Sequence, residues 1–170
     1  MFGANLNKTD LMATNLSSSN LTKASLSGAY MRRVILRDST LVGTNLIGAD
    51  LIGADLIGAN LINSNITAAK LDRADLSESR CFGAKFTGSS LVKSHLTLAN
   101  LTGTNLSMAN LSGSDLVASN LDGSDLSKAN LSGANLECSY AQNQSCRGQA
   151  IGRQFARSAP GRFRSIELRS

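Results

Sequence analysis

LIGADLIGADLIGAN, at residues 46–60, repeats one five-residue pattern three times and changes only its final Asp to Asn. The same pattern continues far on either side. From Leu6 to Leu136 every fifth residue is a central apolar position, and 23 of these 27 residues are Leu. The exceptions are also apolar: Met31, Ile66, Cys81 and Phe86. A period of five therefore governs most of the chain and must reflect its fold.

The positions around each central residue are equally regular. The residue two before the centre is Ala, Ser or Thr, with Val34 as the one exception, and the residue just before the centre is Asn or Asp in 18 of 27 repeats. Gly stands two after the centre 11 times. Asn and Asp suit tight turns because their side chains bond nearby backbone, and Gly permits unusual φ angles or relieves crowding. Each unit is thus predicted to contain a turn.

This period excludes both common regular elements. A strand places alternate residues on one face, and leucines five apart would drift around a helix of 3.6 residues per turn. A chain that turns a corner every five residues, with its leucines inside, satisfies the pattern. Four corners close a square coil of 20 residues, and such coils stack at an inter-strand spacing of about 4.8 Å.

With its motif A(D/N)LXX, the chain resembles the pentapeptide-repeat proteins. The resemblance implies an all-β fold, a right-handed quadrilateral β-helix, here with about seven coils when Met1 is counted as the first centre. We expect this solenoid to span residues 1–140. Residues 141–170 are expected to form a basic C-terminal cap or tail, irregular or with a short helix over residues 148–157.

The net charge of +5 belongs to the tail. Residues 1–140 carry 11 basic and 11 acidic side chains, whereas the tail has one acid, Glu167, and six arginines: Arg147, Arg153, Arg157, Arg162, Arg164 and Arg169. Neither a signal peptide nor an apolar run of about 18 residues is present. The expected compartment is the cytoplasm, or an organelle lumen if a transit peptide has been removed. Free thiols are favoured there, although Cys138 and Cys146 could pair.

The sequence offers no catalytic, cofactor or metal site. Its one histidine, His95, occupies an outward turn position, and no cluster of Cys and His has zinc spacing. No nucleophile has a recognisable base and orienting partner. The many glycines follow the five-residue period and do not form a phosphate-binding loop. We therefore expect a protein that is not an enzyme and takes no cofactor.

The four sides of the coil can be read from sequence, because residues 20 apart should stack. Each side is named here after its first full repeat, giving the Leu6, Leu11, Leu16 and Leu21 faces. The Leu11 face sums to +2. The Leu16 face carries Arg37 alone against six acids and is predicted to attract basic partners; the acids are Asp38, Asp55, Asp75, Glu78, Asp115 and Glu137.

Apolar residues also occupy positions that should face water. Five such positions in succession form a belt around the rod, namely Val42, Ile47, Ile52, Ile57 and Ile62. On the Leu21 face, Val42, Ile62 and Phe82 should stack as a ladder on three adjacent coils. A ladder joined to a belt is large enough to suggest a contact site. The alternative is that β-branched side chains simply suit strands.

Three functions follow from these features. The first is a scaffold that docks on a protein partner through its apolar positions, or associates with itself through a solenoid end. The second comes from the resemblance, since quinolone-resistance members of the family mimic DNA and bind DNA gyrase with an acidic rod. The third is binding of nucleic acid or an anionic surface by the arginine-rich tail.

Overall fold

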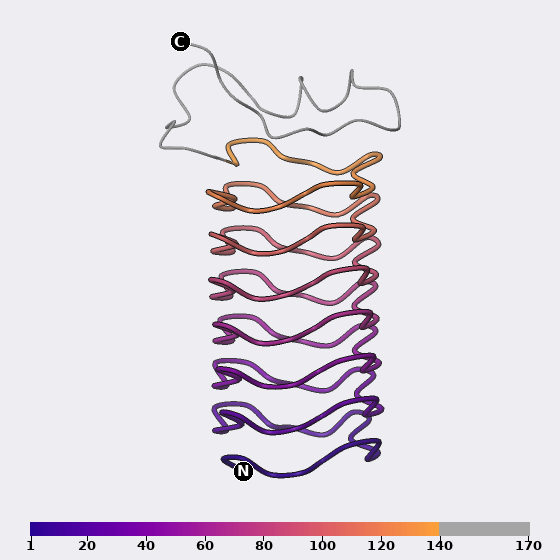
Figure 1. The fold of residues 1–170 in the computed structure, drawn as a ribbon, viewed down its shortest axis with the longest axis vertical. Helices are drawn as coiled ribbons and strands as arrows, with labels where there is room; N and C mark the ends of the chain where they lie inside the picture. Colours follow the sequence, from indigo (N-terminus) through magenta and orange to yellow (C-terminus); the bar gives the residue numbers. More distant parts are fainter. Residues whose placement is uncertain (140–170) are drawn as a thin grey trace.

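A computed structural model describes residues 1–139 of the chain. These residues wind into a stack of similar coils, with residue 1 at one end of the stack (Figure 1). The expected tail, its arginines, the short helix at 148–157 and Cys146 lie outside the described residues. Within residues 1–139 no helix is long and apolar enough to cross a membrane.

Isolated bridges between coils replace continuous strands in the described part of the chain. Each bridge is parallel and joins the residue before a centre to the residue 20 positions later, from Asn5↔Ser25 to Asp115↔Asn135. Between bridges the chain turns, and no helix interrupts residues 1–139. The predicted coil of 20 residues is therefore present, and the architecture is a β-helix with four sides.

Backbone hydrogen bonds hold neighbouring coils together at every repeat. In the unit around Leu46, Asn45 N donates to Ala24 O (3.0 Å), Leu46 N to Asn65 O (2.7 Å) and Gly48 N to Thr67 O (3.0 Å). The corner itself is closed when Ala49 N donates to Leu46 O (3.1 Å). A five-residue unit with a coil on either side thus donates three bonds between coils and one within its own turn, which satisfies its backbone without strand pairing in a flat sheet.

The third residue of every corner adopts the left-handed conformation. All 28 of these positions, from Gly3 to Cys138, have φ between +54° and +69°. Twelve are Gly and 16 are other residues, for which this conformation costs about 1–2 kcal/mol each. Positive φ at the third position is the requirement of a type II turn. The sequence offered two explanations for the frequent glycines, unusual φ angles and relief of crowding. The structure supports the first.

The core is a column of leucines flanked by small side chains. Centres from Leu21 to Leu121 are buried, as are the small residues two before each centre from Ala24 to Ser119. Most buried hydroxyls bond within their own corner: Ser114 Oγ, for example, donates to Leu111 O at 2.7 Å. The first coil is less covered, since Leu6, Leu11 and Leu16 are only partly buried. Packing is therefore complete only where a coil has neighbours above and below.

Candidate interaction surfaces

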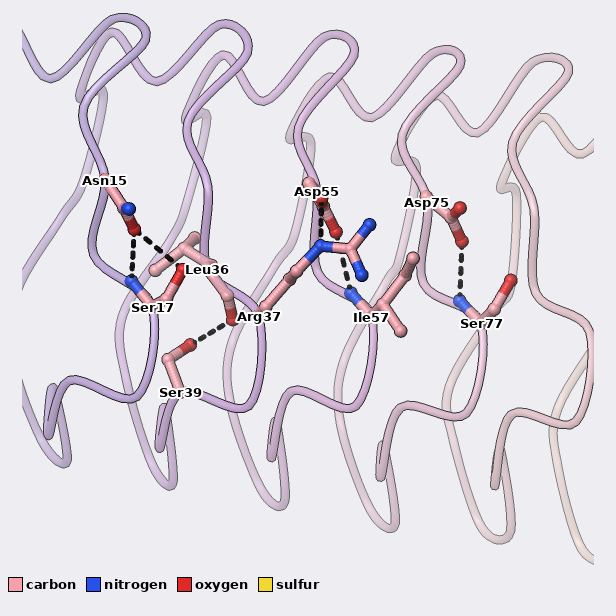
Figure 2. Close-up of polar contacts among 9 residues, drawn as sticks. All are labelled: Asn15, Ser17, Leu36, Arg37, Ser39, Asp55, Ile57, Asp75 and Ser77. Atoms are coloured by element: carbon pink, nitrogen blue, oxygen red, sulfur yellow. Dashed lines mark hydrogen bonds and ion pairs between the residues drawn. The ribbon is translucent and has the colours of Figure 1, made fainter.

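Asn and Asp before each centre stabilise the corner that follows. In all 18 such residues the side-chain Oδ1 accepts from the backbone N–H two residues later, at 2.9–3.4 Å. Figure 2 shows this bond for Asn15, Asp55 and Asp75 on the Leu16 face. Because Asn and Asp make the same bond, charge can vary on these faces without loss of the turn.

A second contact runs diagonally between coils, from the residue after one centre to the residue 18 positions later. Arg37 Nε meets Asp55 Oδ2 at 2.6 Å (Figure 2), and Arg32 Nε meets Asp50 Oδ2 at 2.7 Å. The same diagonal replaces a missing Asn or Asp. Asn7 Oδ1 accepts from Ser25 Oγ and Ser27 N, and Asp72 Oδ1 accepts from Ser90 Oγ and Val92 N. Sequence alone did not reveal these diagonals.

The acidic residues of the Leu16 face lie along one side of the rod over six coils, but they differ in exposure. Asp38, Glu78 and Glu137 are exposed at or near corners, while Asp55, Asp75 and Asp115 are half-buried beside their turns. Arg37 balances Asp55 directly. Five carboxylates of the six therefore remain to act on a partner. Asp75 and Asp115 project from the column that carries the turn-stabilising bonds, so their Oδ1 atoms are already engaged.

The apolar belt surrounds the rod. Ile47 is exposed at 39%, and Val42, Ile52, Ile57 and Ile62 are half-buried. Each isoleucine is the second residue of a corner, and its N–H donates to the Asn or Asp two residues earlier. Since the five residues lie on four different sides, a flat partner can cover only part of the belt. The belt and the ladder consequently meet only at Val42 and Ile62.

The ladder is the more compact of the two apolar features. Gly43 N donates to Ile62 O at 2.9 Å and Asn63 N to Phe82 O at 3.0 Å, which places Val42, Ile62 and Phe82 on successive coils of one face. Exposure rises along this column, from half-buried Val42 and Ile62 to Phe82, half of whose surface is open to solvent. The ladder thus ends in a large exposed aromatic ring.

Several exposed apolar residues were not singled out from the sequence. Leu98 (58% exposed) and Met108 (57%) occupy corner positions with φ near +60°, where Gly is favoured, and Met12 and Tyr30 are also more than half exposed. The left-handed region is unfavourable for a residue with a side chain, and an exposed apolar side chain gains nothing from burial. Neither Leu98 nor Met108 is therefore explained by the fold. The signal available in the sequence was the presence of Leu and Met at the Gly position.

Reactive groups are sparse on the described part of the chain. Cys81 is fully buried, and this burial raises the pKa of its thiol to about 12, an effect that a contact with Ser79 Oγ partly offsets. Within residues 1–139 no three His, Cys, Asp or Glu side chains group as metal ligands. His95 is exposed, as the sequence predicted.

Comparison with known proteins begins with a family model described as pentapeptide repeats. The model matches residues 1–38, 39–78, 79–116 and 109–139, in eight copies. These matches span nearly all of the described chain. No curated protein matches the sequence.

Three solved structures that are similar to this chain are HetL, Rfr23 and QnrB1. HetL, a pentapeptide-repeat protein involved in heterocyst differentiation regulation in Nostoc sp. strain PCC 7120, is 23% identical over 84% of this chain and 91% of its own, with a TM-score of 0.31. Rfr23 from Cyanothece 51142 is 23% identical over 83% and 86%, with a TM-score of 0.36. QnrB1, a plasmid-mediated fluoroquinolone resistance protein, is 15% identical over 91% and 93%, with a TM-score of 0.33.

Proposed function

The chain belongs to the pentapeptide-repeat family, and from this premise we propose that it is a non-catalytic scaffold that presents the sides of its β-helix to a protein partner. We take the solenoid to be right-handed, with about seven coils, and to extend over residues 1–140, followed by a basic cap or tail at 141–170. The proposed contact surface is the ladder of Val42, Ile62 and Phe82 with the belt that meets it, whose other residues, Ile47, Ile52 and Ile57, lie on the other three faces.

The observation that carries this proposal is the exposure of Phe82. A Phe side chain that is half open to water, stacked beyond two branched apolar residues on one side of a rigid rod, has apolar area that a partner could bury at about 25 cal/mol per Å². Aromatic anchors of this kind dominate the energetics of protein interfaces. The rod itself needs no ordering on binding, because each coil is fixed by its hydrogen bonds.

The test is site-specific photo-crosslinking in the source cells. A benzophenone amino acid replaces Phe82 in one variant and Thr102, the next residue along the same column, in a matched control. We expect a discrete crosslinked protein from position 82 that is absent or weak from position 102. The purified partner should then lose at least about tenfold in affinity for Phe82→Ser, which removes an anchor residue. Equal crosslinking from both positions would contradict a specific contact at the ladder.

A second function is favoured by the five carboxylates of the Leu16 face that no arginine balances. Such a face resembles the acidic surface with which quinolone-resistance members of the family imitate DNA, and it would bind DNA gyrase. This rod differs from that pattern because residues 1–140 have no net charge and only one face is acidic. We therefore rank gyrase binding second.

Asparagine substitutions give this alternative a test that leaves the fold intact. Asn makes the same turn-stabilising bond as Asp at 12 of the 18 positions, so Asp75→Asn and Asp115→Asn should remove charge alone. The assay is gyrase supercoiling with purified protein, with and without a quinolone. Inhibition or drug protection that disappears in the double variant supports gyrase binding, and no effect of the wild-type protein excludes it.

A third function, binding of nucleic acid or an anionic surface by the arginines of residues 147–169, rests on residues outside the described structure. It predicts steep dependence of binding on salt, lost on deletion of residues 141–170. Any of these roles is proposed for the cytoplasm or an organelle lumen, as the sequence suggests.

A further inference from the structure

The Leu11 face carries a groove that shares only the belt residue Ile52 with the surfaces proposed above. Two shallow hollows, of about 300 and 360 Å³, lie along this face and share Ile52 as a common wall. One is lined by Ile52, Asp72, Arg73, Val92 and Lys93, and the other by Met12, Ala13, Arg32, Arg33 and Ile52. Together they follow the rod across five successive coils.

Basic side chains form one edge of this groove. Arg33, Arg73 and Lys93 occupy the same corner on different coils, and all three are exposed. The corner between the first two is Gly53, and the Cγ of Arg33 lies 3.7 Å from where a Cβ on Gly53 would be. The Arg33 stem therefore lies along the rod, over the corner of the next coil. The three cations span three coil steps, about 14 Å.

The floor of the groove is apolar at alternate coils. Met12, Ile52 and Val92 stand in one column two coils apart, so they repeat about every 10 Å. Met12 is 51% exposed and the other two are half-buried. The residues between them in this column are charged but partnered: Arg32 pairs with Asp50, and Asp72 accepts from Ser90 Oγ and Val92 N. The charged residues of the floor are therefore partnered, whereas Arg33, Arg73 and Lys93 on the edge form no ion pair within residues 1–139.

We propose that this groove binds an extended acidic peptide segment that carries apolar residues between its carboxylates. Carboxylates would meet Arg33, Arg73 and Lys93, and apolar side chains would contact Ile52 and its column neighbours. At about 3.3 Å per residue, five or six extended residues cover the basic span. The partner identified here is a class of peptide, and its groove lies on a different side of the rod from the Phe82 ladder. The two surfaces share only Ile52, so substitutions at Phe82 and at the three cations test the two proposals separately.

A nucleic acid fits this groove less well. Its phosphates follow one another without apolar groups between them, whereas the floor of the groove is apolar at alternate coils. Single strands are also held by successive aromatic platforms. On the described part of this face Tyr30 is the one aromatic residue. Interleaved apolar and basic residues instead match a peptide that alternates acidic and apolar side chains.

The experiment measures fluorescence anisotropy of a labelled peptide of about twelve residues that alternates Asp or Glu with Leu or Ile. The groove variant combines Arg33→Gln, Arg73→Gln and Lys93→Gln. Its matched control combines Lys8→Gln, Lys23→Gln and Lys128→Gln, which remove the same charge from the same corner position on the Leu6 and Leu21 faces. Thermal melting confirms that both variants remain folded.

We expect the groove variant to weaken peptide binding at least about tenfold, and Ile52→Ser to weaken it about threefold, because charge and apolar contact both contribute. The control variant should change binding less than about twofold. Equal loss in groove and control variants would reduce the effect to net charge and overturn the proposal. So would an unchanged affinity in Ile52→Ser, the absence of peptide binding, or tighter binding of an oligothymidine with the same number of charges.

Discussion

At the scale of single residues, each position of the five-residue unit answers a separate physical demand. The centre fills the core, the Asn or Asp before it bonds the next corner, and the third corner residue must accept positive φ. The first two demands are visible in the sequence because few residue types satisfy them. Positive φ is less visible, since 16 residues that are not Gly also adopt it.

Two buried serines in adjacent repeats provide the first prediction. Ser114 Oγ donates to Leu111 O, whereas Ser119 Oγ is buried without a partner in the described residues. A buried unsatisfied polar atom costs about 1–3 kcal/mol, and a satisfied one contributes about 1 kcal/mol. Ser119→Ala should therefore stabilise the protein by about 1 kcal/mol and Ser114→Ala should destabilise it by a similar amount. Urea denaturation of both variants measures the difference, and a loss of stability in Ser119→Ala would contradict it.

Cys81 provides a prediction on pH. Burial raises the pKa of its thiol from an ordinary value of about 9 to about 12. Between these values the unfolded chain loses this proton and the folded chain keeps it, so stability falls as pH rises, by about 1.4 kcal/mol per pH unit from this group. Below pH 9 the thiol has no effect on the pH dependence.

The measurement is the free energy of unfolding at pH 8 and pH 10.5, for the wild-type protein and Cys81→Ala. All other residues are the same in the two proteins, so their contributions cancel in the comparison. We expect the wild-type protein to lose about 2 kcal/mol more than the variant over this interval. Equal pH dependence of the two proteins would show that the thiol ionises as readily in the fold as in the unfolded chain.

At the scale of one coil, the unit of packing is a layer of four central residues. Most of these central residues are leucines. One layer contains the smaller Cys81 followed directly by the larger Phe86, and both are completely buried. We interpret this pair as a compensation of volume within one layer, because interiors are packed without spare space.

A double-mutant cycle tests this compensation. Phe86→Leu should leave a cavity and cost roughly 1–2 kcal/mol, and Cys81→Leu should overpack the layer and cost roughly 1–3 kcal/mol. The double variant restores a layer of leucines and should be more stable than the sum of the single losses predicts, by at least about 0.5 kcal/mol. Additive losses would mean that the two side chains do not share space. Urea denaturation of the four proteins supplies the cycle.

The coil was predictable from sequence because its determinants are local and recur every five residues. Period five excluded helix and strand, and the faces could be assigned by counting to 20. The surface was less predictable. Whether Arg37 reaches Asp55, or Arg33 lies along Gly53, depends on the rotamers of side chains that reach from one coil to the next. Leu98 and Met108 were marked in the sequence only by their place at the position where Gly is frequent. The ladder of Val42, Ile62 and Phe82 was placed correctly on one column, and its function remains a prediction.

At the scale of the whole molecule, every surface depends on the register between coils. The backbone of one five-residue unit is nearly the same as that of any other, so removing one unit should preserve the hydrogen bonds while turning all later residues by a quarter of the circumference. Columns that span the deletion are then broken. Columns that lie wholly before it are untouched. Repeat proteins tolerate such changes because each unit contacts only its neighbours.

Two deletions of five residues exploit this property. Deletion of 61–65 separates Arg33 from Arg73 and Lys93, which move to another side, whereas deletion of 101–105 lies beyond all three. Each removes one buried Leu, worth about 1.5–3 kcal/mol, so both should lower thermal stability to a similar extent. Only the first should weaken binding of the acidic peptide, by at least about fivefold, because the cations no longer share a groove. If both deletions bind the peptide as the wild-type protein does, the basic residues act singly, and the alignment of the column is irrelevant to recognition.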